Sequence, residues 1–260
     1  MAHRLIKNQH GFKTVNTQQQ YSFADVHKIK RFQEGVLKYW GASDRKNLPW
    51  RLTSDPWRIL LAEILLRKTT AVQVARIYET IARLSFKQIR EMRSDDLEAL
   101  LLPMGMYRVR ARQIHAIAEV LASKKRQAFK SPEFLQNLPG VGRYARNAVM
   151  CFAFNLPKPA LDTNMIRLIN RVCGIDSNRS RAHEDKHLWD FAETLVPKDK
   201  CREFNWGVLD LANAVCKPRS PQCFSCSLQD ICDYWNSIDS NSSDLKKQSG
   251  SLKQSSEVNV

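Results

Sequence analysis

Four cysteines near the C-terminal end constrain the fold of this chain more than any other feature. Cys216, Cys223, Cys226 and Cys232 are separated by six, two and five residues. Four thiolates so close in sequence can surround one inorganic centre, and thiolates are the usual ligands of iron–sulfur clusters. Zinc also accepts four cysteines, but usually as two C-x-x-C pairs, and only Cys223 and Cys226 form such a pair. We expect one 4Fe-4S cluster with four cysteine ligands; zinc and a disulfide pair are the alternatives.

The net charge indicates a polyanionic partner. The 260 residues include 41 lysines and arginines against 26 aspartates and glutamates, which gives a net charge of +15. With 43% hydrophobic residues the chain can bury a core, so this charge lies on a folded surface. Nucleic acid is the commonest polyanion, and a generally basic soluble protein is the alternative. The lack of a long apolar run and of a signal-peptide core predicts a cytoplasmic, nucleoid-associated protein.

The apolar periodicity is helical almost throughout and strands with alternating polarity are missing, so we expect an all-α fold. The predicted helices cover residues 56–66, 71–84, 94–102, 111–121, 131–138, 144–154, 164–173, 183–195 and 203–215. Residues 1–27 are expected to form a flexible basic and polar arm. Residues 236–260 are rich in Ser, Asn, Gln and Lys and are expected to be a disordered tail.

A glycine-containing turn lies between two predicted helices. In Leu138-Pro139-Gly140-Val141-Gly142, two glycines two residues apart allow a sharp turn and expose amide groups at the start of the next helix. Such an end attracts a phosphate, and Arg143 adds charge beside it. An ordinary interhelical turn is the alternative.

Two carboxylates stand out. Glu63 lies inside the apolar run Ile59–Leu66, where a buried carboxylate costs several kcal/mol unless it is paired or faces a polar cavity. It is therefore a candidate pocket acid, with an ion pair to Arg67 as the alternative. Asp162 precedes a predicted helix and is either a plain N-cap or a carboxylate at the rim of a cleft.

The hairpin at 138–142, Asp162 and the cysteine loop together resemble the helix–hairpin–helix DNA glycosylases of the endonuclease III superfamily, over residues 28–235. The resemblance implies two helical lobes with double-stranded DNA bound between them and the target nucleotide flipped into the cleft. One lobe is the central bundle with the hairpin, residues 52–160. The other combines residues 28–51 with residues 161–235, which include the cluster loop. Such enzymes usually act as monomers.

Position 144 decides the expected reaction class within this superfamily. Members that also nick DNA carry a lysine two residues after the last hairpin glycine, where it forms a Schiff base with the sugar. Here that residue is Tyr144, and no lysine occurs from Ser131 to Pro157. We therefore expect a monofunctional enzyme, with Asp162, Glu63 and Tyr144 as the catalytic residues.

Two branches of the superfamily compete. Adenine glycosylases acting opposite 8-oxoguanine share Leu48-Pro49-Trp50-Arg51, but usually carry Gln-Gln where this chain has Arg67-Lys68, and a large C-terminal domain. The block from Glu63 to Thr70, together with Tyr144 and Cys201–Asn205, is instead similar to the archaeal-type mismatch-specific thymine glycosylases. That similarity implies removal of thymine or uracil paired with guanine, in base excision repair. A non-catalytic protein that binds lesions or mismatches is the alternative of another class.

The resemblance also implies DNA contacts. Met106 is the candidate wedge that enters the base stack, and a methionine packed into the core is the alternative. Arg67 and Lys68 are candidates for filling the gap left by the flipped base or for binding the opposite guanine. The full set of expected DNA-binding residues is Arg67, Lys68, Met106, Tyr107, Leu138, Gly140, Val141, Gly142 and Arg143.

Overall fold

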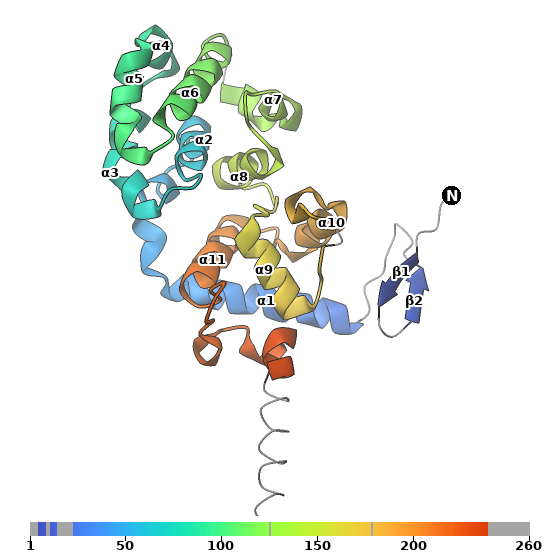
Figure 1. Cartoon of the computed structure of the whole chain (residues 1–260). Coiled ribbons are helices and arrows are strands. Elements are labelled where there is room, and N and C mark those ends of the chain that lie inside the picture. The colour runs from blue at the N-terminus through green and yellow to red at the C-terminus, as the bar shows by residue number, and fades with distance from the viewer. Residues whose placement is uncertain (1–4, 9–10, 15–22, 125, 178, 239–260) are drawn as a thin grey trace, which may run out of the picture.

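The computed structural model describes residues 5–8, 11–14, 23–124, 126–177 and 179–238. The chain folds mostly into helices that form two lobes, one of α2 to α7 and one of α1 and α9 to α11, with α8 between them (Figure 1). The helices of the first lobe are α2 (Pro56–Leu65), α3 (Ala71–Ala82), α4 (Phe86–Glu91), α5 (Ser94–Leu101), α6 (Tyr107–Leu121) and α7 (Pro132–Gln136). The others are α8 (Arg143–Phe154), α1 (Phe23–Ala42), α9 (Thr163–Cys173), α10 (Lys186–Leu195) and α11 (Cys201–Ala214). Short 3-10 turns include Asp44–Asn47, Pro49–Arg51, Leu102–Met104, Cys223–Ser225 and Gln229–Ile231.

The first lobe is built around α2. Asp55 caps this helix by accepting a hydrogen bond from the amide of Arg58, and Pro56 occupies its first turn, as the sequence predicts. Every residue of α2 except Arg58 is buried, because the helix is enclosed by its neighbours and packs along α8. A carboxylate on α2, such as Glu63, therefore lies inside the protein, not on its surface.

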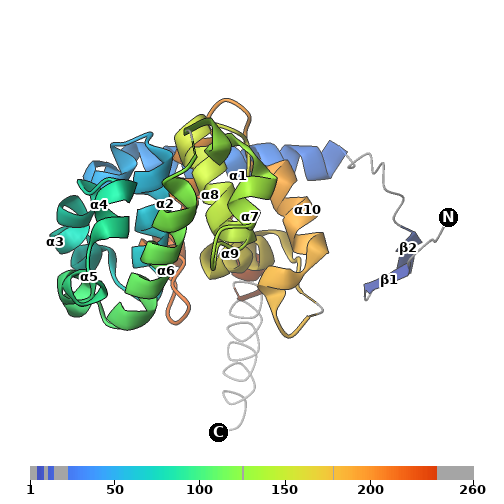
Figure 2. The same ribbon diagram turned by 90° about the horizontal axis from the view of Figure 1, so that it is seen from above.

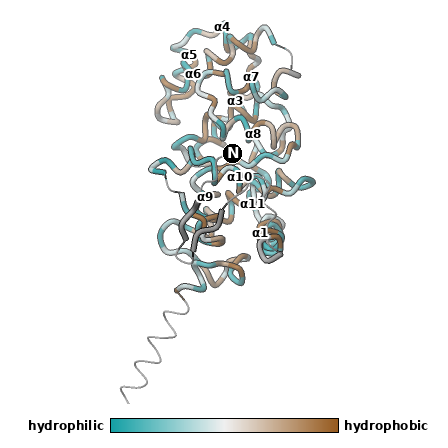
Figure 3. The backbone as a smooth tube through the Cα atoms, turned by 90° about the vertical axis from the view of Figure 1, so that its right-hand side faces the viewer, coloured by the Kyte–Doolittle hydropathy of each residue, from teal (hydrophilic) through white to brown (hydrophobic). Residues whose placement is uncertain are grey.

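The second lobe is held together by the close approach of α1 and α11. A Cβ atom on Gly207 of α11 would lie 2.9 Å from the backbone oxygen of Val36, so only glycine fits this crossing. The rings of Phe32 and Phe204 pack beside it, with centroids 6.1 Å apart. The view from above shows α1 running past the ends of α8 and α10 (Figure 2). Hydrophilic and hydrophobic residues alternate along the helices (Figure 3), as expected for helices that each bury one face.

The mostly helical fold confirms the main expectation, and three details correct it. Two short antiparallel strands, β1 (Leu5–Asn8) and β2 (Gly11–Thr14), form a hairpin in the expected arm, so the chain is not all-α. Each segment has only four residues, which is too short for its alternation to be recognised. The first helix begins at Phe23, within the stretch assigned to the arm.

The start of the expected tail is also ordered. Residues 233–238 are helical, and the amide of Asn236 donates to the carbonyl of Cys232. Residues 239–260, most of the expected tail, lie outside the described residues. Within the described part of the chain, no helix is long and apolar enough to cross a membrane.

Candidate active site and DNA-facing loops

Glu63 is buried at the meeting point of the two lobes. Its side chain comes from α2, only 7% of the residue is exposed, and no ion pair to it occurs in the part of the chain that the structure describes. The simple ion pair with Arg67 is therefore absent. Burial raises the pKa of Glu63 to about 7; a hydrogen bond with Tyr144 opposes this rise, and the nearby Asp162 adds to it. Near neutral pH this carboxyl is poised between its acid and its ionised form.

Tyr144 lies on the first turn of α8, two residues after Gly142. Burial raises the pKa of its phenol well above 10, and the charges of Glu63 and Asp162 raise it further. The phenol therefore stays protonated and is hydrogen-bonded to Glu63. The ring is half-buried and packs against the core, so the core-aromatic alternative agrees with its position.

Asp162 is the N-cap of α9. Its Oδ1 accepts hydrogen bonds from the amides of Asn164 and Met165, both at 2.9 Å, and its Oδ2 accepts one from the Asn164 side chain at 2.6 Å. Burial raises the pKa of Asp162, while these hydrogen bonds favour its ionised form. The capping role is therefore confirmed. Asp162 also raises the pKa values of both Glu63 and Tyr144, so all three predicted catalytic residues share one site.

The segment that delivers Asp162 is fixed by two buried amides. The Asn147 side chain donates to the carbonyl of Pro159 at 3.0 Å. Asn205 on α11 is fully buried; its Oδ1 accepts the amide of Ala160 at 2.8 Å, and its Nδ2 donates to the carbonyl of Lys158 at 3.2 Å. These bonds hold residues 158–160, which lie in the connection from α8 to α9, against α8 and α11. They thereby set the position of the Asp162 carboxylate.

Sequence reasoning missed a buried ion pair beside the acids. The guanidinium of Arg51 donates two hydrogen bonds to Asp210 of α11, at 2.8 and 2.9 Å, and lies against the rings of both Trp40 and Trp206. Its positive charge lowers the pKa of Glu63. In the sequence, Arg51 is recognised as part of the motif Leu48–Arg51, but Asp210 is not identified. The role of Asp210 depends on the packing of α11 beside Arg51, which the sequence alone does not show.

The glycine turn has the expected shape. Gly140 has a φ of +68°, and a Cβ atom there would lie 2.7 Å from the Gln113 side chain, so glycine is required. Gly142 begins α8 without a side-chain cap. The side chains of Leu138 and Val141 are buried, which leaves the backbone of the turn for the expected phosphate contact. Arg143 lies over the ring of Trp189 at 4.2 Å and pairs with Glu193 at 3.5 Å.

Two loops present the other expected DNA contacts. Met106 is 52% exposed, so the alternative of a methionine packed into the core is wrong. Tyr107, which follows it, packs against the core. Arg67 donates to the carbonyl of Gly140 at 2.9 Å and thus ties its loop to the hairpin. Lys68 is exposed and adopts a left-handed backbone conformation with a φ of 52°.

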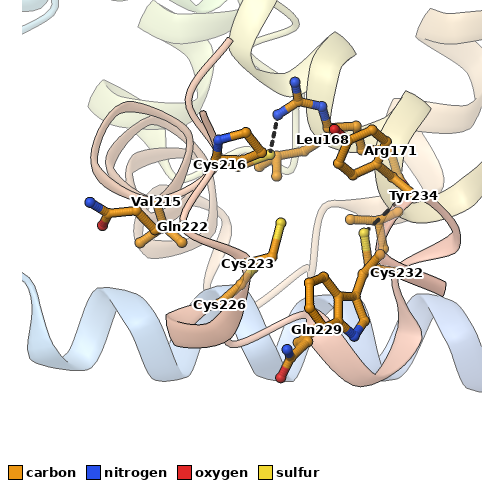
Figure 4. A pocket seen from close by; sticks show the side chains of 13 residues that line it. Leu168, Arg171, Val215, Cys216, Gln222, Cys223, Cys226, Gln229, Cys232 and Tyr234 are labelled. Atoms are coloured by element: carbon orange, nitrogen blue, oxygen red, sulfur yellow. Dashed lines mark hydrogen bonds between the residues drawn. The ribbon is translucent and has the colours of Figure 1, made fainter. Parts of the chain in front are cut away.

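The four cysteines of the C-terminal loop line one pocket of about 340 Å³, its open mouth included. Figure 4 shows the sulfur atoms of Cys216, Cys223 and Cys232 turned toward the same space. Burial, together with the other three thiols nearby, raises the pKa of Cys226 to about 11. Among the described residues, no three His, Cys, Asp or Glu side chains form a group that could hold a metal ion.

Comparisons with known proteins agree with this architecture. Residues 61–194 match the model of the HhH-GPD superfamily base excision DNA repair proteins. The chain is 40% identical to the thymine-DNA glycosylase of Aeropyrum pernix over 82% of this chain and 98% of that protein. It is 40% identical to the thymine/uracil-DNA glycosylase of Pyrobaculum aerophilum, over 79% of this chain and 92% of that protein. Its fold matches a thermostable thymine-DNA glycosylase with a TM-score of 0.74 and 36% identity, covering 81% and 98% of the two chains.

More distant relatives include the adenine DNA glycosylase of Buchnera aphidicola (Acyrthosiphon pisum), which is 28% identical over 77% of this chain and 58% of that protein. The expected order of the relatives, thymine glycosylases before adenine glycosylases, is confirmed. With more than half of its residues matched by the family model, the chain belongs to the HhH-GPD superfamily of base excision DNA repair proteins.

Proposed function

We propose that this protein is a monofunctional DNA glycosylase that hydrolyses the N-glycosidic bond of thymine or uracil mispaired with guanine. The observation that carries the proposal is the cluster of Glu63, Tyr144 and Asp162 at the junction of the lobes, with a tyrosine where a lyase requires lysine. The relatives at 37–40% identity, named thymine or thymine/uracil glycosylases, support this choice of base.

The two carboxyl groups suit different roles. Asp162 accepts three hydrogen bonds that favour its anion, so it stabilises the positive charge that develops on the sugar as the base departs. Glu63 has a pKa of about 7, which suits a group that exchanges a proton or a hydrogen bond with the flipped pyrimidine. Water then adds to the sugar and leaves an abasic site.

With tyrosine at position 144, this residue cannot form a covalent intermediate with the sugar. A phenol cannot form an imine with the sugar, and the hydrogen bond to Glu63 occupies its hydroxyl. Its role is to orient the Glu63 carboxyl and to form one wall of the base pocket. On this basis the enzyme releases the base without nicking the strand.

DNA binding rests on the exposed loops and the hairpin. The start of α8 offers amide donors to a phosphate of the target strand. Met106 is exposed and is the wedge residue, and Lys68 enters from the neighbouring loop. The protein acts on double-stranded DNA as a monomer.

We further propose that Cys216, Cys223, Cys226 and Cys232 hold one 4Fe-4S cluster. All four line one pocket whose other walls are largely apolar, and thiolates are the ligands of such clusters. A cube of four irons is wider than a single ion, so its ligands stand further apart than those of zinc. The cluster supplies structural support for the loop, since hydrolysis transfers no electrons. Iron and sulfide contents of the purified protein test this, with Cys226→Ser expected to lose both.

A panel of duplexes tests the reaction. The protein is incubated with duplexes containing G·T, G·U or A·8-oxoguanine pairs, and strands with and without alkali treatment are compared. We expect alkali-dependent cleavage at the thymine or uracil only. Release of adenine alone would favour the adenine glycosylase activity, and tight binding without base release would favour a non-catalytic mismatch-binding protein. Cleavage without alkali would contradict the monofunctional assignment.

A variant tests the roles of the residues. Asp162→Asn keeps an oxygen that can cap α9 and removes the charge, so we expect base release to fall at least 100-fold while duplex binding stays within a few-fold. Full base release by this variant would overturn the role proposed for Asp162. Tyr144→Lys, which restores the lyase-type residue, is the complementary variant. Trapping with borohydride would then report an imine.

A further inference from the structure

Arg110 is a buried charge that the proposed chemistry does not use. It lies on the first turns of α6 and is 4% exposed. No carboxylate pairs with it anywhere in the described ranges. Burying an arginine without an anion is costly unless its N–H donors all have acceptors. The hydrogen-bond partners of Arg110 therefore explain how its burial is tolerated.

Its partners are backbone and hydroxyl oxygens from two loops. On the α2–α3 side, the guanidinium donates to the carbonyls of Ile64, Leu65 and Arg67 and to the hydroxyl of Thr69, the last at 2.6 Å. On the other side, its Nε donates to the carbonyl of Gly105 at 3.2 Å. One rigid, planar group therefore joins the loop that follows α2 to the loop that precedes α6.

Each of the joined loops carries an exposed residue with an unfavourable backbone. Lys68 has a φ of 52° and Met106 a φ of 48°, both in the left-handed region. For a residue with a side chain this conformation is unfavourable and persists only where the surroundings impose it. Arg110 binds the residues on both sides of Lys68, namely Arg67 and Thr69, and the residue before Met106, namely Gly105.

We propose that Arg110 is a positioning residue for base extrusion, which holds Lys68 and Met106 in left-handed conformations so that both enter the duplex together. Extrusion of the base requires a wedge between the stacked bases and a side chain that fills the vacated space. Since one guanidinium sets both loops, the two side chains act as one unit. This inference rests on the proposed action on DNA and adds the residue that sets the geometry of insertion.

A competing route runs through the base pocket. Arg110 also binds the carbonyls of Ile64 and Leu65, directly after Glu63. Its loss could therefore disturb the pocket and not the inserting loops. The two routes differ in one respect: if Arg110 acts through Lys68 and Met106, its substitution has no further effect once both side chains are removed.

The experiment is a double-mutant cycle read by two signals. The first signal is the fluorescence of 2-aminopurine placed next to the mismatched thymine, which rises when the target base leaves the stack. The second is the single-turnover rate of base release. Arg110→Lys keeps the charge but cannot span both loops. Arg110→Met removes the charge as well. Arg58→Lys is the matched control, because Arg58 also donates to a helix-terminal carbonyl, that of Ala82, but at the opposite end of α2.

We expect Arg110→Lys to lower the fluorescence rise and the rate at least 10-fold, with duplex binding changed less than 3-fold and Arg58→Lys close to the unchanged protein. In a Lys68→Ala/Met106→Ala background, Arg110→Lys should change either signal less than 2-fold. An equal loss in both backgrounds, or no loss in the first, overturns the inference. If no duplex is cleaved at all, the proposed function fails, while the fluorescence still tests the role of Arg110.

Discussion

Replacing Glu63 with glutamine measures how strongly the fold disfavours the carboxylate. Burial raises the pKa of Glu63 from 4.5 to about 7. At about 1.4 kcal/mol per pH unit, the ionised form costs the folded chain about 3 kcal/mol. Because folding raises this pKa, the cost is absent below pH 4.5, grows as the pH rises and is complete above about pH 7. Glutamine removes the charge and keeps a partner for the Tyr144 hydroxyl.

We therefore expect Glu63→Gln to match the unchanged protein in unfolding free energy near pH 4.5 and to exceed it by about 2–3 kcal/mol at pH 8.5. Urea titrations followed by tryptophan fluorescence measure this difference across the pH range. Glu119→Gln is the control, since it makes the same substitution at an exposed position on α6. A difference that is independent of pH, or one that grows as the pH falls, would refute the assignment of a buried, neutral Glu63.

Two further substitutions test the packing that positions the site. Gly35→Ala would place a Cβ atom 2.5 Å from Cδ2 of Leu228, so we expect a loss of about 1–3 kcal/mol in unfolding free energy and, if the proposed cluster is bound, faster release of its iron to a chelator. Gly41→Ala on the same helix meets nothing within 4 Å and should be neutral or stabilising. Asp210→Asn leaves the buried Arg51 without its anion, and we expect a loss of about 3–5 kcal/mol in unfolding free energy by urea titration. A loss below 1 kcal/mol would show that Arg51 is hydrated.

Local patterns in the sequence predict most of the helices and their ends. The cap Asp55 and the proline after it mark the start of α2, and the apolar run that follows explains why nearly the whole helix is buried. The same run identified Glu63 as anomalous, since a carboxylate has no solvent there. The apolar periodicity did not identify α1 or the short helix α4, whose six residues provide too little periodicity to recognise.

The missed parts of the site depend on contacts between distant segments. Asp210 and Asn205 both lie on α11. Asp210 pairs with Arg51 and Asn205 accepts the amide of Ala160 only because the folded chain packs α11 against these two segments. Contacts of this kind join residues far apart in the chain, so no local periodicity reports them.

Arg110 is a further residue whose role the local sequence does not predict. Within its own segment it is one of several arginines between Tyr107 and Gln113, and an exposed, solvated role is the natural expectation for each of them. Its neighbour Arg112 fulfils that expectation, since it is exposed and donates to the carbonyl of Arg108 on the same helix. Arg110 and Arg112 differ in the side of α6 on which they lie. Arg110 faces the C-terminal end of α2, where unpaired backbone oxygens carry partial negative charge. An arginine at the C-terminal end of a helix can donate to these oxygens and needs no carboxylate. A search of the sequence for charge pairs therefore does not identify it.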